Sequence, residues 1–230
     1  MSVVADRQPD EEDPGGLIAG GWVLVDGSVV TNPNSAVLPG ASVVIRREKV
    51  LRGRVKLEAA LDRFGVDVTG RVALDVGAST GGFTSALLAA GAARVYAVDV
   101  GHGQLLGSLR QDPRVVTLES TNLADLGPGL VPDILGLLTV DLSFLALAEG
   151  LPQFDPGLLA PDAELVALVK PMYELHLAAP PTGEGELARA LAVAVAGAEA
   201  AGWSVTETMP SPVTGGRGAE EFLFHARRSP

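Results

Sequence analysis

A short loop rich in glycine follows an apolar run, in the stretch V-A-L-D-V-G-A-S-T-G-G-F-T at positions 72–84. Its glycines, Gly77, Gly81 and Gly82, let the backbone approach a ligand closely. Their G-x-x-x-G-G spacing differs from the G-x-G-x-x-G of dinucleotide sites, and the G-K-[ST] of triphosphate loops does not follow. Asp75 stands just before the loop, where a carboxylate can face a positively charged part of a ligand. S-adenosylmethionine carries an ammonium and a sulfonium but no phosphate, and we therefore predict a site for this methyl donor.

Two side chains with acid–base chemistry follow apolar runs of their own. Asp141 ends T-V-D and Lys170 ends L-V-K. The carboxyl ends of parallel strands share one edge of a sheet, so both side chains should emerge beside the glycine loop. The chain has 14 Arg but only three Lys, which suggests that Lys170 serves where a group must be able to lose a proton. Lys56 and Glu221 complete the candidate set, although Lys170 or Lys56 taken alone could also be a surface charge.

Alternating strands and helices are needed to bring these residues together. From residue 72 onward, apolar runs alternate with Ala- and Leu-rich segments, and Asp99 ends a strand where it can accept hydrogen bonds from ribose hydroxyls. This order predicts an α/β fold with a Rossmann-like doubly wound sheet whose last strands pair antiparallel. The predicted strands are 72–76, 94–98, 115–118, 134–140, 164–169, 204–208 and 221–226, and the predicted helices are 56–64, 82–90, 104–110, 145–150 and 184–201.

The first part of the chain differs in composition from the rest. Residues 1–16 are acidic and contain prolines, and we expect them to be disordered. Residues 17–45 hold short β-like runs at 22–25, 29–30 and 41–45, with a D-G turn at Asp26 and Gly27, and predict a small β-rich unit. The expected organisation is therefore a tail at 1–16, a small unit at 17–46 and a catalytic domain at 47–230.

Composition limits the class of protein. The chain has 230 residues, 47% of them hydrophobic, which suits one α/β domain with a small appendage. It has no cysteine, no leader segment and no uninterrupted span of membrane length, and we expect a soluble cytoplasmic protein without a membrane partner. His102, His176 and His225 lack the spacing of a metal site or a triad, and we expect no metal.

Charge is distributed unevenly along the sequence. The net charge of −11 disfavours general affinity for nucleic acid, because phosphate binding depends on clustered Lys and Arg. Residues 46–56, R-R-E-K-V-L-R-G-R-V-K, nevertheless hold six of the 17 basic residues and a single acid. This basic strip is either a solvated linker or a local contact for the phosphates of RNA.

The sequence from Lys56 to Arg228 resembles the TlyA group of ribosomal RNA 2′-O-methyltransferases, often called hemolysins, within the wider FtsJ-like class. Residues 15–45 are similar to the second half of the S4 RNA-binding domain that precedes the catalytic domain in this family. The motifs that carry the resemblance are R-G-R-V-K-L at 52–57, L-D-V-G-A-S-T-G-G-F-T at 74–84, A-R-V-Y-A-V-D-V-G at 93–101, R-Q-D-P-R-V at 110–115, V-D-L-S-F at 140–144, L-V-K-P at 168–171, S-P-V-T-G at 211–215 and E-F-L at 221–223.

The resemblance implies an S-adenosylmethionine-dependent enzyme that acts on RNA. It implies a catalytic tetrad of Lys56, Asp141, Lys170 and Glu221, all of which are present. It also implies a donor-binding set made of Asp75, Gly77, Ser79, Thr80, Gly81, Gly82, Phe83, Asp99, Asn122 and Asp141. The sequence differs from the family pattern where the basic first helix of S4 is replaced by the acidic tail, and where the glycine-rich segment after K-P-x-[FY]-E is shortened.

A mechanism without a metal follows as a hypothesis. Methyl transfer from a sulfonium is an in-line displacement, so positioning of the acceptor oxygen supplies much of the effect. Lys170 would be the base, or the group that orients the ribose hydroxyl, and the two carboxylates would orient the lysines. The alternatives are a small-molecule methyltransferase that has lost its RNA-binding surface, a donor-binding protein without catalysis, and a glycine-rich turn that binds no ligand.

Overall fold

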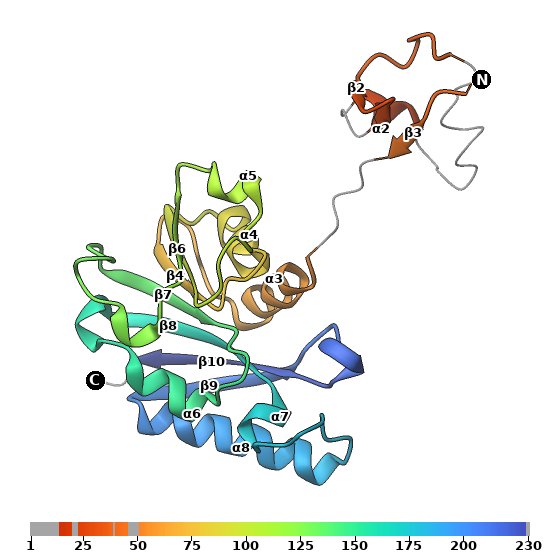
Figure 1. Cartoon of the computed structure of the whole chain (residues 1–230). Coiled ribbons are helices and arrows are strands. Elements are labelled where there is room, and N and C mark those ends of the chain that lie inside the picture. Colours follow the sequence, from red (N-terminus) through yellow and green to blue (C-terminus); the bar gives the residue numbers. More distant parts are fainter. Residues whose placement is uncertain (1–13, 20–22, 39, 46–50, 229–230) are drawn as a thin grey trace. The chain divides into compact units, whose positions relative to one another are not determined.

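The structure, a computed structural model, describes residues 14–19, 23–38, 40–45 and 51–228 (Figure 1). The chain divides into two compact units, Met1–Lys49 and Val50–Pro230. Several apolar residues of the first unit form a cluster around the buried side chains of Ile18 and Val23. The second unit holds two larger apolar clusters, one on each face of its sheet.

A three-stranded antiparallel sheet forms most of the described part of the first unit. Strands β1 (Val23–Val25), β2 (Ser28–Val30) and β3 (Val43–Ile45) lie in the order β2-β1-β3. Asp26 and Gly27 have φ values of 48° and 81°, as a tight turn between β1 and β2 requires, which confirms the predicted D-G turn.

A short helix, α2 (Pro14–Ala19), precedes this sheet. The expectation of a disordered tail was therefore wrong for residues 14–16, which begin α2. The reason is tertiary packing, because Leu17 and Ile18 contribute to the apolar cluster with the strands. Residues 1–13 lie outside the described residues, as does Trp22 in the first predicted strand.

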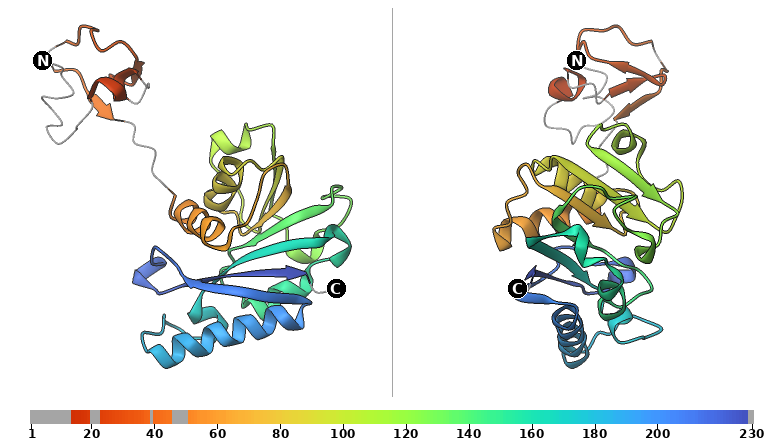
Figure 2. Two further views of the ribbon diagram at one scale, coloured as in Figure 1. Left: turned by 180° about the vertical axis from the view of Figure 1, so that it is seen from behind. Right: turned by 90° about the vertical axis from the view of Figure 1, so that its left-hand side faces the viewer.

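A seven-stranded sheet spans the second unit in the order β6-β5-β4-β7-β8-β10-β9 (Figure 2). Strands β4 to β8 pair in parallel, whereas β10 runs antiparallel to both β8 and β9. The predicted doubly wound, Rossmann-like sheet with an antiparallel last strand is confirmed. The strands are β4 (Val72–Val76), β5 (Arg94–Asp99), β6 (Val115–Glu119), β7 (Leu135–Val140), β8 (Leu159–Val169), β9 (Trp203–Pro210) and β10 (Phe222–Arg228).

Helices cover both faces of this sheet. Leu57 of α3 and Leu87 of α4 belong to one apolar cluster, whereas Leu147 of α6 and Ala194 of α8 belong to the other. Because both faces are covered, the strand ends are the part of the sheet open to a ligand. The helices are α3 (Arg52–Phe64), α4 (Gly82–Ala89), α5 (Gly107–Arg110), α6 (Leu147–Gly150), α7 (Pro171–Glu174) and α8 (Glu184–Ala200), with 3-10 turns at Leu123–Asp125, Leu151–Gln153, Pro156–Leu158 and Gly216–Gly218.

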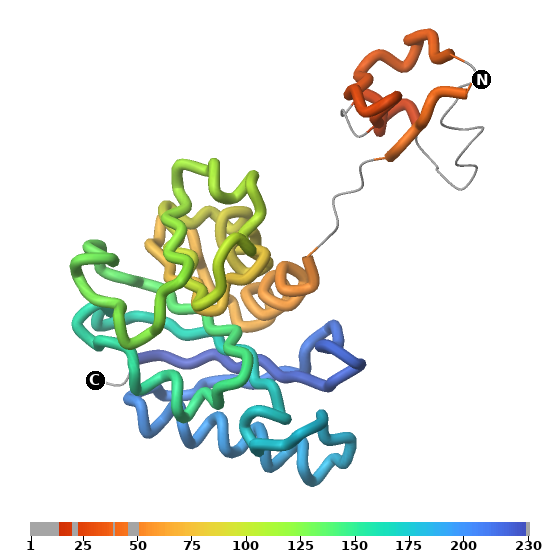
Figure 3. The backbone as a smooth tube through the Cα atoms, in the orientation of Figure 1, coloured from red at the N-terminus to blue at the C-terminus, as the bar shows by residue number. Residues whose placement is uncertain are grey.

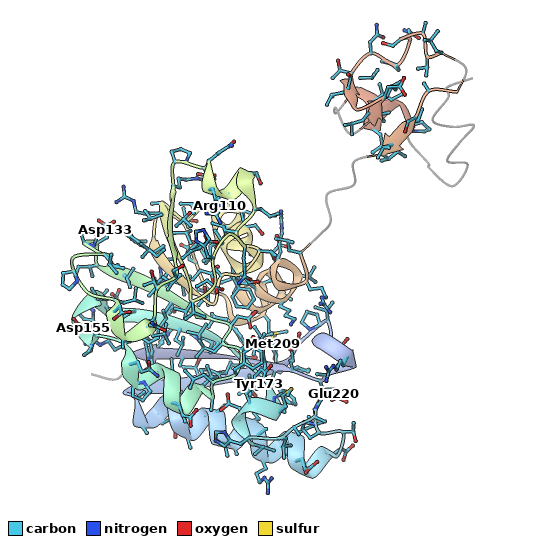
Figure 4. All side chains as sticks on the ribbon, viewed as in Figure 1. Arg110, Asp133, Asp155, Tyr173, Met209 and Glu220 are labelled. Atoms are coloured by element: carbon cyan, nitrogen blue, oxygen red, sulfur yellow. The ribbon has the colours of Figure 1, made fainter. Side chains whose placement is uncertain are left out.

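Several predicted elements have different bounds in the structure, and the causes of two of these differences are visible. The helix expected at 104–110 shortens to α5, because the Glu119 carboxylate accepts backbone N–H groups within 3.1 Å from Gly103, Gln104 and Leu105. Glu119 also accepts a hydrogen bond from Arg110 (labelled in Figure 4), and these contacts lower its pKa to about 2. Strand β8 is longer than predicted, because residues before Glu164 pair with the start of β7.

Candidate active site

The glycine loop connects β4 to α4 at the carboxyl end of the parallel strands. Gly77 has a φ of 78°, and a Cβ atom there would lie 2.2 Å from the carbonyl oxygen of Asp141, so a side chain at this position is excluded. Gly81 has a φ of 96°, and a Cβ atom there would lie 2.1 Å from a leucine side chain. The N–H groups of Gly77 and Ala78 donate to the carbonyl of Val98 at 2.9 and 3.0 Å. The loop is thus a tight turn held against the ends of β5 and β7.

Asp75 lies beneath this loop and is fully buried. Its Oδ2 accepts a hydrogen bond from the Thr84 hydroxyl at 2.6 Å, and its Oδ1 accepts one from the Thr139 hydroxyl at 3.2 Å. Burial raises the pKa of Asp75 to about 7, with Asp141 adding a smaller rise. The sequence predicts that this carboxylate faces a charged part of a ligand. In the structure the protein encloses the side chain instead. Asp75 instead ties the first turn of α4 to β4 and β7.

Asp99 ends β5 and holds the other side of the loop. Its Oδ2 accepts the backbone N–H of Ser79 at 2.8 Å, and its Oδ1 accepts the backbone N–H of Gly101 at 2.7 Å. Val100, the next residue, is 71% exposed. The end of β5 therefore presents a carboxylate next to an uncovered apolar side chain, an arrangement that suits the ribose and adenine of a nucleoside.

The remaining residues of the predicted donor set occupy different environments. Phe83 is buried in the apolar cluster beneath α3 and α4, so its side chain does not reach a ligand. Thr80 is exposed, and its carbonyl accepts the N–H of Leu106. Asn122 is exposed after β6 and donates to Asp125 at a long 3.5 Å. Thr80 and Asn122 remain predicted donor-binding residues.

Helix α3 approaches the loop through a contact between two glycines. A Cβ atom on Gly82 would lie 2.8 Å from the Cα atom of Gly53, so Gly82 has no room for a side chain, and a Cβ atom on Gly53 would lie at a tight 3.2 Å from the Cα atom of Gly82. The prediction that Lys56 begins this helix was wrong, because α3 begins at Arg52. Lys56 therefore lies one turn inside α3, just after the glycine contact.

The four residues of the predicted tetrad form two ion pairs. Lys170 Nζ lies 2.5 Å from Asp141 Oδ1 and donates a hydrogen bond to the Ser143 hydroxyl at 2.9 Å. Lys56 Nζ pairs with Glu221 Oε2, and both of these side chains are buried. The two lysines come from different elements: Lys56 lies in α3, and Lys170 directly follows β8.

Strand register brings the two pairs to the same end of the sheet. Asp141 and Lys170 directly follow the parallel neighbours β7 and β8. Phe222 is opposite Val169 in the antiparallel ladder of β8 and β10, so Glu221 stands beside Lys170. The connection from β9 to β10, which projects beyond the sheet in Figure 3, packs on Glu221, because a Cβ atom on Gly215 would lie 2.1 Å from its Oε1.

An aromatic residue that the sequence analysis missed lies next to these pairs. Phe144 is 88% exposed, has a φ of 70°, and lies 5.5 Å between ring centroids from Tyr173, which is labelled in Figure 4. Single exposed apolar side chains are common on protein surfaces, so it is the place of Phe144 beside the ion pairs that makes it a candidate substrate contact. The signal that could have found it is its position three residues after Asp141, in the loop that follows a predicted site residue.

The basic strip is described only in part. Residues 46–50 lie outside the described residues. Arg52 is exposed at the start of α3, and Arg54 Nε pairs with Glu58 Oε1 at 2.7 Å. A phosphate contact by this strip remains a prediction.

The sheet order and the loop after β4 define a class of enzyme. A seven-stranded sheet with a single antiparallel strand next to one edge, and a glycine loop at its carboxyl end, is the Rossmann-like fold of S-adenosylmethionine-dependent methyltransferases. The helices in the described part of the chain include none with the length and hydropathy of a membrane span.

Comparison with known proteins narrows the class to a family. Residues 50–228 match the FtsJ-like methyltransferases. Over 227 residues the chain is 40% identical to the 16S/23S rRNA (cytidine-2′-O)-methyltransferase TlyA of Mycobacterium tuberculosis, covering 92% of this chain and 82% of that protein. Hemolysin A of Brachyspira hyodysenteriae is 34% identical over 220 residues, covering 91% of this chain and 90% of that protein. A solved hemolysin structure from Streptococcus thermophilus has a TM-score of 0.74 at 33% identity, covering 99% of this chain and 87% of that one.

The chain belongs to the FtsJ-like methyltransferase family, in its TlyA group. It is an S-adenosylmethionine-dependent methyltransferase, and the resemblance seen in the sequence is confirmed at this level. The predicted truncated S4 unit remains a prediction.

Proposed function

We propose that this chain transfers a methyl group from S-adenosylmethionine to the 2′-hydroxyl of a ribose in ribosomal RNA. The observation that carries the proposal is the pair of lysine–carboxylate contacts beside the glycine loop. A relative at 40% identity is named for 2′-O-methylation of cytidine in ribosomal RNA, which supports the acceptor class.

The residues at the carboxyl end of the sheet fit the donor. Gly77 lets the loop lie directly against the backbone of Asp141, Asp99 can accept hydrogen bonds from ribose hydroxyls, and Val100 offers an apolar surface for adenine. When bound, S-adenosylmethionine supplies an electrophilic methyl group. Asp75 supports this site indirectly, because it holds the start of α4 against the central strands.

Lys170 is the residue proposed to act on the acceptor hydroxyl. Asp141 and Ser143 hold its Nζ at 2.5 and 2.9 Å, so the amine has a defined direction. Lys170 orients the 2′-hydroxyl and, in its neutral form, accepts the proton as the new C–O bond forms and the C–S bond breaks. Lys56 and Glu221 form the buried second pair, and they fix the charge distribution around this hydroxyl.

Two surfaces are proposed to receive the RNA. Phe144, exposed near Lys170 and in contact with Tyr173, can stack on the base of the acceptor nucleotide. The basic strip at 46–56 can contact phosphates, and the first unit is proposed to act as a partial S4-like RNA-binding module.

The experiment that tests the proposal is transfer of labelled methyl from S-adenosylmethionine to purified ribosomal subunits and to total RNA. We expect RNA to be labelled by the wild-type protein and not by the Lys170→Ala variant. Labelling of small molecules from a cell extract, with none in RNA, would contradict the proposal and favour the small-molecule methyltransferase, which the net charge of −11 suits.

A further inference from the structure

Glu174 is a buried carboxylate that the proposed chemistry does not use. It ends α7, shortly after Lys170, and is 4% exposed. Its Oε1 accepts the backbone N–H of Leu147 at 3.0 Å, and its Oε2 has no hydrogen-bond partner among the described residues. Burial raises its pKa to about 7, Glu149 adds to the rise and His176 opposes it. Burying a carboxyl group is costly unless its oxygens are hydrogen-bonded, and only one oxygen of Glu174 has such a partner among the described residues.

The donor that Glu174 binds lies at the start of α6. The first N–H groups of a helix have no acceptor within the helix. Ala146, which precedes α6, has no side chain able to accept them, and Glu149 accepts the N–H of Ala146 only at 3.4 Å. Glu174, from another element, therefore supplies the shorter of the two carboxylate contacts that hold the beginning of α6.

Residues 141–147 form a segment that we name the acceptor loop, because it carries Ser143 and Phe144. This loop contacts the segment 170–174 at three places. Its start contacts Lys170 through Asp141 and Ser143, its middle contacts Tyr173 through Phe144, and its end contacts Glu174 through Leu147. Glu174 is the contact that fixes the far end.

We propose that Glu174 is a positioning residue, which anchors the acceptor loop so that Ser143 and Phe144 face the RNA acceptor. This inference rests on the proposed function for its consequence in catalysis, but not for the anchoring itself. Glu174 acts through the Leu147 N–H and touches no reacting atom. Loss of the anchor should weaken productive binding of RNA and leave the donor site beside β4 and β5 unchanged.

Hydrogen exchange of the isolated protein tests the anchor without any assay of activity. Glu174→Met keeps the length of the side chain but removes the acceptor, whereas Glu174→Gln keeps a carbonyl oxygen. We expect faster exchange in residues 141–150 of E174M, and wild-type exchange in E174Q and in the matched control Glu199→Met, which replaces an exposed carboxylate of α8. Exchange in E174M equal to the wild type would overturn the proposal, and E174A replaces E174M if the latter does not fold.

Steady-state kinetics test the consequence. In E174M the KM for ribosomal RNA should rise about tenfold, while the KM for S-adenosylmethionine and both constants of E174Q stay within about twofold of the wild type. An unchanged KM for RNA in E174M, or an equal loss in E174Q, would overturn the positioning role. If the wild-type protein methylates no RNA, the proposed function fails, and hydrogen exchange still decides the role of Glu174.

Discussion

At the residue scale, the side chains of the two ion pairs differ in solvent exposure. The side chains of Lys56 and Glu221 are 8% and 5% exposed, whereas those of Lys170 and Asp141 are 16% and 24% exposed. The more exposed pair is the one that can reach an acceptor, and the buried pair is costly to break because either partner left alone is a buried charge. This difference supports the proposed roles of Lys170 at the acceptor and of Lys56 as its support.

Replacement of Lys170 tests this assignment. Lys170→Ala should lower methyl transfer by about 10³-fold, within the range for loss of a proton-transfer group, while the affinity for S-adenosylmethionine changes little. Lys170→Arg, which keeps the charge but cannot lose its proton, should also be inactive. Single-turnover transfer and calorimetric donor binding measure the two effects. Substantial activity in K170A would show that another group acts on the hydroxyl.

The buried Asp75 makes stability depend on pH. Its pKa is raised from 3.8 to about 7, so the folded state binds a proton that the unfolded state has released between these values. The free energy of unfolding should therefore fall as pH rises through this range. In Asp75→Asn this fall should be smaller, by on the order of a few kcal/mol. Urea unfolding of both proteins at about pH 5 and pH 8 measures the difference. If the free energy of unfolding changed equally with pH in both proteins, the raised pKa of Asp75 would be contradicted.

Residue types and the ends of apolar runs were enough to propose which residues form the site, but not how deeply each side chain is buried. Scarce lysine and the ends of two apolar runs single out Lys170 and Asp141, and the structure brings them into an ion pair. The enclosure of Asp75 could not be predicted, because it depends on hydroxyl groups from two other elements. Phe144 was missed because exposure and a positive φ are set by the surrounding loop rather than by its own sequence.

At the element scale, the position of α3 depends on the contact between Gly53 and Gly82. The backbones approach so closely that a methyl group on Gly82 has no room, and one on Gly53 would be tightly packed. Because Lys56 lies one turn after Gly53, the contact also sets the distance from Lys56 to Glu221. The glycine at 82, predicted to bind the donor, thus has a packing role.

Gly82→Ala should separate α3 from α4. We expect a loss of about 1–3 kcal/mol in stability, as for other overpacked contacts, and a loss of activity larger than the unfolded fraction explains. Gly185→Ala in α8 is the matched control, because a Cβ atom there meets nothing within 4 Å and alanine favours a helix. Thermal melts and methyl transfer on both variants give the comparison. A G82A protein with normal activity would show that the contact does not position Lys56.

Elements were predictable where periodicity is strong and local. The strand at 72–76 and the main helices appear as expected, with small shifts at their ends. The predicted helix at 104–110 failed at its start, because a distant carboxylate, Glu119, binds the backbone there. A local pattern of apolar residues does not reveal that a distant side chain will bind the backbone groups that a helix would use.

At the scale of the whole molecule, charge is distributed unevenly along the chain. The net charge is −11, yet six basic residues lie at 46–56, where the first unit meets the second in sequence. RNA binding by such a chain should rest on this strip, because the rest of the chain, residues 1–45 included, is acidic on balance. The predicted donor-binding residues all belong to the second unit.

Removal of residues 1–49 should therefore weaken RNA binding and spare the donor site. The slope of log affinity against log salt should fall by up to about three, because three basic residues of the strip are lost. The triple variant Arg46→Ala, Arg47→Ala, Lys49→Ala in the full chain is the control, since it removes the charges and keeps the first unit. Filter binding at several salt concentrations gives the slopes. Equal slopes in all three proteins would place the RNA contacts elsewhere.

The position of the methyl group on the RNA tests the central claim most directly. A methyl group on the 2′-oxygen prevents alkaline cleavage of the neighbouring phosphodiester, because that hydroxyl is the attacking group. After transfer of labelled methyl to ribosomal subunits and alkaline hydrolysis, we predict that the label is found in alkali-resistant dinucleotides. Label in mononucleotides would place the methyl on a base, and would contradict an acceptor hydroxyl held by Lys170.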